Sequence, residues 1–266
     1  NYKENIFSVI PRLRYRDGEA LAPDLTIFLN GLPIFTVELK NPLTGQDVTD
    51  AKRQYKQTRD PRDTLFSYGR CLAHFAVDPH EVYMTTELKG EDTFFLPFNK
   101  GYDGGAGNPP AEDGYRTEYF WKYLLSKDSV LDLVQNFITE FREQDEEGEL
   151  TEDEHLIFPR YHQLDAVRRL VSDSRHQGAG KRYLIQHSAG SGKTFTIAWL
   201  AHQLAELHNP QNQPVFDSVI VISDRRVLDD QLQHHLKEFE DTRGVVRNIK
   251  GQSTELKEAL EAGEKI

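Results

Sequence analysis

The sequence predicts an α/β protein, in which a domain with a mixed sheet precedes an incomplete domain with a parallel sheet. Three observations predict this fold class. Two β-branched, apolar segments, residues 25–29 and 34–39, are separated by Asn30-Gly31, a dipeptide typical of tight hairpin turns. Strand-like and helix-like segments alternate after residue 180, as in doubly wound parallel sheets. Between these two patterns, residues 140–154 contain nine acidic residues and one basic residue.

The first half continues with further mixed elements. Apolar residues on one face predict a helix around residues 48–55, and residues 71–77 and 82–86 have the composition of strands. The glycine-rich segment 98–115 is predicted to be a long surface loop. A last helix is expected to be capped by Ser129 and to bury one apolar face. That face is formed by Val130, Leu133, Val134, Phe137 and Phe141.

The acidic segment 140–154 keeps no apolar period, so it is predicted to be a solvated linker. It sets the expected boundary between one domain at residues 1–145 and another at residues 146–266.

The second half predicts strands at residues 183–186 and 219–223 and a helix at residues 194–207. A further helix is predicted from an apolar face made of Leu228, Leu232, Leu236 and Phe239. This order of elements predicts the parallel sheet.

The composition excludes some classes of protein. A net charge of −11 argues against coating nucleic acid by bulk attraction, although a local basic groove stays possible. A single cysteine, Cys71, fits a reducing compartment, and no apolar run reaches the roughly 18 residues of a membrane span. We therefore expect a cytoplasmic protein with no membrane segment. Because the chain opens at Asn1 and its only methionine is Met84, we also expect a fragment.

Basic residues cluster in two stretches, and they are compatible both with a solvated face and with a phosphate-binding track. These residues are Arg12, Arg14, Arg16, Lys52, Arg53, Lys56, Arg59 and Arg62.

Asp24, Glu38 and Lys40 form the first candidate site. Residues two apart on a strand share a face, so Glu38 and Lys40 are expected to project together, with Leu39 turned to the opposite, buried side. The hairpin brings Asp24 back beside Glu38. A two-residue turn alone would set Asp24 opposite Val37, on the wrong face. A longer turn or a β-bulge is therefore predicted.

Two carboxylates about 4 Å apart repel by roughly 4 kcal/mol at an effective dielectric near 20, so a cation is expected between them. Mg²⁺ suits such a site, because it takes one or two carboxylates and completes its shell with water and phosphate. The ion would activate a water molecule, and Lys40 would steady the growing charge. The pattern indicates Mg²⁺-dependent phosphodiester hydrolysis. The alternative is a hairpin whose acids are structural.

These residues lie in a segment that resembles the PD-(D/E)xK nuclease core of the restriction (R) subunit of type I restriction–modification enzymes. The resemblance is carried by Ala22-Pro23-Asp24-Leu25, Asn30-Gly31-Leu32-Pro33 and Val37-Glu38-Leu39-Lys40-Asn41-Pro42. It implies that Asp24 and Glu38 are metal ligands and that Lys40 is the catalytic lysine. A family motif, Q-x-x-x-Y, implies that Gln54 supports the site, although Thr58 stands where the tyrosine belongs.

The second candidate site is a glycine-rich phosphate loop between a predicted strand and a predicted helix. Its sequence is Gln186-His187-Ser188-Ala189-Gly190-Ser191-Gly192-Lys193-Thr194. Backbone N–H groups of such loops point at phosphate oxygens, the lysine reaches the β and γ phosphates, and the threonine hydroxyl completes the Mg²⁺ shell. The segment resembles superfamily 2 helicases, which tolerate a residue such as His187 in place of the first glycine. ATP is therefore the expected ligand of Ala189, Gly190, Ser191, Gly192, Lys193 and Thr194.

Two further positions are similar to motifs of those motors. Gln163, which is 30 residues ahead of the loop's Lys193, is expected to read adenine; the alternative is a solvated residue at the start of a helix. Arg225 and Arg226 follow the predicted strand 219–223 and match a motif that faces DNA, with a salt-bridged helix start as the alternative.

Taken in order, the motifs imply a PD-(D/E)xK endonuclease domain at 1–145 and the N-terminal part of a RecA-like ATPase/helicase domain at 146–266. The resemblance implies a type I site-specific deoxyribonuclease that uses Mg²⁺ and ATP. Its implied partners are double-stranded DNA and the modification (methyltransferase) and specificity subunits. ATP hydrolysis is not expected of this chain alone, because no acidic motif follows the loop. The competing interpretations are a DNA-repair nuclease–helicase and a non-catalytic DNA-binding or assembly module.

Overall fold

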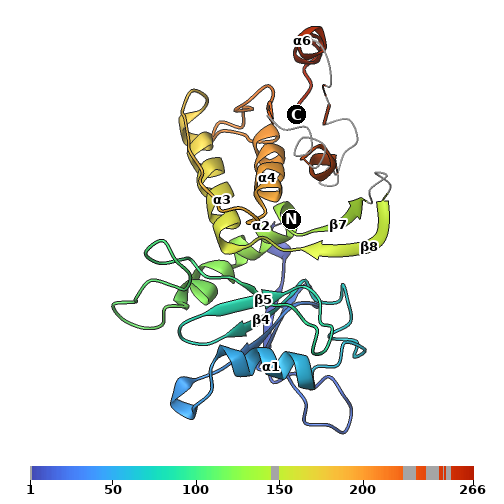
Figure 1. Cartoon of the computed structure of the whole chain (residues 1–266), viewed down its shortest axis with the longest axis vertical. Coiled ribbons are helices and arrows are strands. Elements are labelled where there is room, and N and C mark those ends of the chain that lie inside the picture. The colour runs from blue at the N-terminus through green and yellow to red at the C-terminus, as the bar shows by residue number, and fades with distance from the viewer. Residues whose placement is uncertain (1, 145–149, 224–231, 238–245, 248, 250–252) are drawn as a thin grey trace. The chain divides into compact units, whose positions relative to one another are not determined.

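The computed structural model describes residues 2–144, 150–223, 232–237, 246–247, 249 and 253–266. It divides into two compact units, Asn1–Tyr161 and His162–Ile266, and each is described by itself. Figure 1 traces the chain through both.

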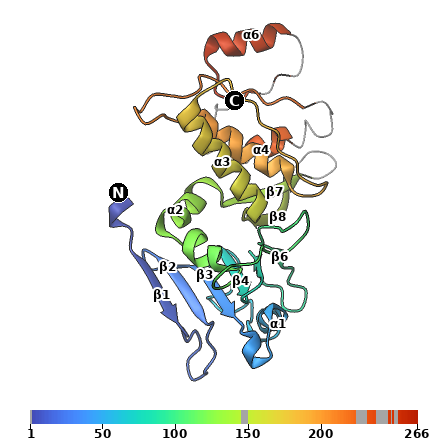
Figure 2. The ribbon, with the colours of Figure 1, turned by 90° about the vertical axis from the view of Figure 1, so that its left-hand side faces the viewer.

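A six-stranded mixed sheet forms the centre of the first unit. Its elements are β1 (Phe7–Pro11), β2 (Leu25–Leu29), β3 (Leu32–Leu39), α1 (Val48–Thr58), β4 (Ala73–Val77), β5 (Val82–Thr85), β6 (Leu96–Pro97), α2 (Lys127–Asn136), β7 (Thr139–Gln144) and β8 (Leu150–Ile157), with short helical turns η1 (Tyr2–Glu4), η2 (Pro42–Thr44) and η3 (Phe120–Leu124). The sheet order is β1-β2-β3-β4-β5-β6, and β3 and β4 are the parallel pair. Figure 2 shows β1 to β4 side by side. The mixed sheet expected for the first half is confirmed.

The hairpin of β2 and β3 turns at Asn30-Gly31, both of which have positive φ angles, as a tight hairpin turn requires. Beyond the turn the pairing shifts by one residue, because Ile27 pairs with Phe35 whereas Phe28 pairs with Pro33. This irregularity leaves Ile34 as the extra residue of β3. The turn has two residues, so the register is set by a β-bulge, one of the two solutions that the sequence predicts.

The two faces of β3 pack against different cores. Phe35 contacts the rings of Phe75 and Phe158 at centroid distances of 5.5 and 6.0 Å, which builds an aromatic cluster on one face. On the other face, Thr36 lies against Tyr55 of α1, which packs across β3, β4 and β5 (Figure 1). Beyond the bulge, the alternation of strand side chains therefore directs Thr36 and Glu38 toward α1.

Helix α1 is fastened to the sheet by polar contacts as well as by its predicted apolar face, which is buried. Its first N–H group, that of Val48, donates to the buried carboxylate of Asp78 at 3.0 Å. In its middle, the Tyr55 hydroxyl and Thr36 Oγ1 are 2.8 Å apart, and Thr36 Oγ1 is 2.7 Å from Nδ1 of His74. These contacts fix the helix relative to β3 and β4.

Two predictions for the end of the first unit are wrong. Helix α2 begins at Lys127, ahead of Ser129, and ends at Asn136, so Phe141 lies in a strand and Val134 is 36% exposed. The acidic segment expected to be a linker forms β7 and β8, which pair antiparallel around the undescribed residues 145–149. Arg142 and Glu154 form a cross-strand ion pair at 3.0 Å. Opposite charges on facing strands favour pairing, so a charged segment can form a hairpin. The two compact units meet between Tyr161 and His162, and the expected domain boundary at 145/146 stays a prediction.

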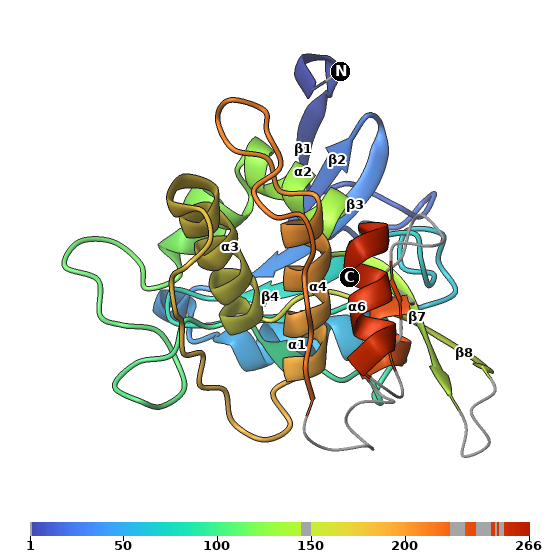
Figure 3. The ribbon, with the colours of Figure 1, turned by 90° about the horizontal axis from the view of Figure 1, so that it is seen from above.

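The second unit contains α3 (Tyr161–Gln177), α4 (Lys193–Ala205) and α6 (Ser253–Ala262). Helices α3 and α4 lie side by side (Figure 3). Residues 232–237 are helical and include the predicted apolar positions Leu232 and Leu236, whereas Leu228 and Phe239 fall outside the described residues.

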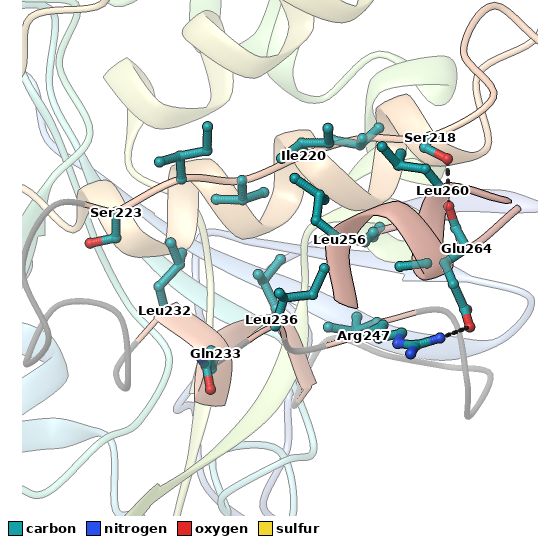
Figure 4. Close-up of a pocket in the computed structure, with 17 residues that line it drawn as sticks. Ser218, Ile220, Ser223, Leu232, Gln233, Leu236, Arg247, Leu256, Leu260 and Glu264 are labelled. Carbon is teal, nitrogen blue, oxygen red and sulfur yellow. Dashed lines mark hydrogen bonds and ion pairs between the residues drawn. The ribbon is translucent and has the colours of Figure 1, made fainter. Parts of the chain in front are cut away.

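The described part of the second unit contains no β-strand. Residues 183–186 and 219–223 belong to no strand, so the predicted strands are absent there, although the N–H of Val219 donates to Lys265 O at 2.8 Å. An extended segment becomes a strand only when a neighbour accepts its hydrogen bonds. Residues 218–223 instead border an apolar cavity of about 310 Å³ with Leu232, Leu236 and Leu256 (Figure 4).

Among the helices of the described residues, none combines the length and apolarity required to traverse a bilayer.

The core histidine yields a prediction about stability. Burial lowers the pKa of His74 to about 3, against about 6.5 in an unfolded chain. Between these values only the unfolded state binds the proton, so stability present above pH 6.5 is lost as the pH falls. As the pH falls from 6.5 to 5, the free energy of unfolding of the first unit should decrease by roughly 2 kcal/mol more than that of a His74→Asn variant, because the slope is about 1.4 kcal/mol per pH unit.

Urea unfolding followed by Trp121 fluorescence, in a Trp199→Phe background, measures this loss for the first unit alone, since the chain has two tryptophans. Equal pH dependence in the two proteins would contradict the assignment of a neutral, buried His74.

Candidate functional site

The bulge in β3 sets the position of the two acidic residues of the first candidate site. Leu25 pairs with Val37, so Asp24 stands opposite Glu38 at the next position of the hairpin. The Asp24 carboxylate accepts a hydrogen bond from the backbone N–H of Leu39 at 2.8 Å. This bond holds the Asp24 side chain at the end of β3, next to Glu38.

Glu38 is buried and paired with a cation that the sequence did not single out for this place. The side chain of Glu38 is fully buried on the α1 face of β3. Arg59, which caps the end of α1, approaches its Oε1 atom with Nε at 2.8 Å and Nη2 at 2.7 Å. Neither interpretation of the basic cluster, solvated face or phosphate track, holds for Arg59. The exposed residue here is Leu39, at 42%, which the sequence predicted to be buried.

The electrostatics of Glu38 reflect these surroundings. Burial raises the pKa of the Glu38 carboxyl to about 7, the charge and hydrogen bond of Arg59 oppose the rise, and the charge of Asp24 adds to it. Because Glu38 is buried and lies near a second acid, its ionised form is energetically unfavourable unless a further cation binds.

Lys40 and Gln54 complete the cluster. The amine of Lys40 donates to Oε1 of Gln54 at 2.5 Å. Gln54 of α1 therefore orients the side chain of Lys40, which follows the end of β3. The backbone N–H of Lys40 donates to Val77 O, which ties this end of β3 to β4. Thr58, at the position of the expected tyrosine, bonds back to Gln54 O within the helix at 2.7 Å and does not reach the acids. The structure thus brings Asp24, Glu38, Lys40 and Gln54 together.

The donor set suits a divalent cation with few protein ligands. Oε2 of Glu38 is buried and has no hydrogen-bond partner, and the charge of Asp24 acts on the same carboxyl group. Within the described ranges, no group of three or more His, Cys, Asp or Glu residues could hold a metal ion. Mg²⁺ commonly takes only one or two carboxylates and fills the remaining positions with water and phosphate, so two carboxylates fit it.

The phosphate loop of the second unit lies ahead of α4, and Lys193 is the first residue of that helix. Gly190 and Gly192 have φ angles of 69° and 75°, which favour glycine and turn the loop back on itself. The amine of Lys193 donates to the carbonyl of Ser188 at 2.8 Å. Thr194 follows on the helix. The geometry is that of a loop folded around the lysine.

Gln163 lies buried against the phosphate loop, so the alternative of a solvated residue at the start of the helix is wrong. Its side chain is 3% exposed and its Nε2 donates to the carbonyl of Gly192 at 2.8 Å and that of Ser191 at 3.3 Å. A Cβ atom at Gly192 would lie 2.6 Å from this Nε2. Gln163 therefore holds the phosphate loop, and its adenine contact stays a prediction. Arg225 and Arg226 lie outside the described residues.

Arg59 is the residue that sequence reasoning missed. It belonged to a recognised basic cluster, but no periodic signal distinguishes a buried arginine from a solvated one. A usable signal existed, because a glutamate on an otherwise apolar central strand needs a cation nearby.

Two protein families match parts of this chain. Residues 1–93 match the type I restriction enzyme R protein N terminus, and residues 162–266 match the SWI2/SNF2 ATPase. The second match begins where the second compact unit begins.

Curated relatives extend over both units. A putative type I restriction enzyme endonuclease subunit of Methanocaldococcus jannaschii (MjaVIIIP) is 29% identical over 87% of this chain and 21% of that protein. The HindI endonuclease subunit of Haemophilus influenzae is 26% identical over 83% of this chain and 20% of that protein. The chain therefore spans about a fifth of the length of these relatives. Over most of its residues the chain is related to the endonuclease (R) subunits of type I restriction enzymes, with an R-protein N-terminal region followed by a SWI2/SNF2-type ATPase region.

Proposed function

We propose that the first unit hydrolyses phosphodiester bonds of DNA with Mg²⁺ held by Asp24 and Glu38. The observation that carries this proposal is the β-bulge of β3, which sets two carboxylates opposite each other with a lysine alongside. Relatives over most of the chain are named endonuclease subunits, which supports the same reaction class.

The residues of the site divide the work. Mg²⁺, when bound, would lower the pKa of a water molecule and stabilise charge that grows on the phosphate. Asp24 is oriented by the N–H of Leu39 and offers its carboxylate, while Glu38 offers Oε2. Lys40 is oriented by Gln54, which is uncharged, so the amine keeps its full charge for the attacking hydroxide or the phosphate.

We also propose that the second unit binds ATP through the loop residues Ala189, Gly190, Ser191, Gly192, Lys193 and Thr194, with Gln163 beside the loop. Displacement of the Lys193 amine from Ser188 O by nucleotide phosphates is the step that the loop geometry supports. In the longer protein, this unit would take part in ATP-driven translocation along double-stranded DNA. Arg225 and Arg226 would contact that DNA, and modification (methyltransferase) and specificity subunits would complete the complex in the cytoplasm.

A non-catalytic role remains the second candidate, because one observation favours it. The Arg59–Glu38 pair already neutralises part of the acidic pair, as a purely structural ion pair would. Metal binding separates the two proposals.

The nuclease proposal predicts a loss of cutting on substitution of Asp24. Asp24→Asn should lower Mg²⁺-dependent nicking of supercoiled plasmid by at least about 100-fold, because the metal loses a charged ligand. Lys40→Gln should lower nicking similarly yet retain Mn²⁺ binding, since Lys40 is not a proposed metal ligand and bonds to Gln54. Asp17→Asn, an exposed acid in the β1–β2 connection, is the control. Mn²⁺ binding that is equal in the wild type and in Asp24→Asn would favour the structural role.

The nucleotide proposal predicts that Lys193→Ala weakens binding of a fluorescent ATP analogue by at least about 100-fold, because the amine is the loop's point charge for the β and γ phosphates. Fluorescence anisotropy at fixed Mg²⁺ measures the affinity. Lys181→Ala, which removes an exposed amine paired with Asp173, should leave it unchanged. Unaltered binding by Lys193→Ala would remove the loop assignment.

A further inference from the structure

Arg59 meets Glu38 in a geometry that treats the two carboxylate oxygens unequally. Both Nε and Nη2 of Arg59 approach Oε1, at 2.8 and 2.7 Å, while Oε2 has no hydrogen-bond partner. A guanidinium can bind both oxygens of a carboxylate with two parallel bonds, and that arrangement is common. Here both nitrogens bind the same oxygen and the other oxygen has no partner, while the charges of Asp24 and Lys40 also act on this carboxyl.

The guanidinium is held in this place from its remaining sides. Nη2 also donates to the carbonyl of Ala22 at 2.9 Å, and Nη1 donates to the Tyr15 hydroxyl at 3.4 Å. Tyr15 in turn packs edge-on against Phe66, with ring centroids 4.9 Å apart. The side chain of Arg59 is 2% exposed. It therefore cannot swing into solvent to vacate Oε1 for another cation without breaking several contacts.

The position of Arg59 matters for how many metal ions the site can hold. In two-metal sites the ions lie about 3.5–4 Å apart and share carboxylate oxygens. Two guanidinium nitrogens within 2.8 Å of Oε1 fill the place at that oxygen where a second ion would bind. Charge leads to the same conclusion. Of the two acids, Glu38 is already paired with Arg59, so one Mg²⁺ beside Asp24 leaves the site positive for a phosphate and a second ion would be repelled.

We propose that Arg59 is a positioning residue that stands in for a second metal ion, so that the site takes a single divalent cation through Oε2 of Glu38 and the carboxylate of Asp24. The inference rests on the proposed metal role of these two acids. It assigns Arg59 no contact with substrate. Arg59 acts through Glu38, whose free oxygen it selects.

The experiment counts Mn²⁺ ions on the whole chain without nucleotide, by electron paramagnetic resonance at pH 8. The wild type should bind one Mn²⁺ that is lost in Asp24→Asn, and the bound ion should show no magnetic coupling to another. Arg59→Ala frees Oε1 and vacates the space beside it, so it should bind two Mn²⁺ ions with a coupled spectrum. Arg59→Lys returns a positive charge and should restore a stoichiometry of one.

Arg53→Ala is the matched control, because this arginine lies on α1 but is 57% exposed and pairs with Asp50. It should keep one ion. Two coupled ions in the wild type, or one ion in both the wild type and Arg59→Ala, would overturn the inference while leaving the metal role of Asp24 and Glu38 intact. A wild type that binds no Asp24-dependent ion would overturn both. If Arg59→Ala fails to fold, the wild-type count still tests the single-ion claim, because two coupled ions in the wild type would overturn it.

Discussion

A glutamate on a central strand can be buried only if something positive accompanies it, and the first unit is arranged around that constraint. Glu38 lies where β3 and β4 pair in parallel, and its side chain is fully buried. Breaking a buried ion pair by removing one partner costs about 3–5 kcal/mol, so Arg59 is as necessary to the fold as to the site. The end of α1, the Tyr15 segment and the carbonyl of Ala22 all converge on that arginine. The position of α1 and the geometry of the acids are therefore coupled.

The local elements of the first unit could be predicted because their signals are local. The Asn30-Gly31 turn, the buried face of α1 and the strands β2 to β5 follow from periodicity and turn chemistry. The need for a bulge could be predicted as well, since two acids that share a cation must stand on one face. Where the bulge would lie, at Ile34, could not, because that depends on how β3 packs against both cores.

Other features depend on contacts distant in sequence, and these were missed. An acidic segment reads as a linker until its partner strand is known, and the pairing of Arg142 with Glu154 turns it into β7 and β8. The burial of Arg59 depends on Glu38, 21 residues earlier. In the second unit the predicted strands do not form among the described residues. The apolar side chains of residues 219–223 therefore meet the cavity beside Leu232 and Leu236 rather than a sheet.

The two candidate sites share a way of preparing a positive charge. Lys40 donates to the amide oxygen of Gln54, and Lys193 donates to the carbonyl of Ser188. An uncharged acceptor orients an amine without neutralising it, so the charge stays available to a phosphate, whereas a carboxylate partner would cancel it. Arg59 shows the opposite arrangement, since its charge is taken up by Glu38. The two lysines that are proposed to bind phosphate are thus held by uncharged oxygens. The arginine that positions a proposed metal ligand is held by a carboxylate.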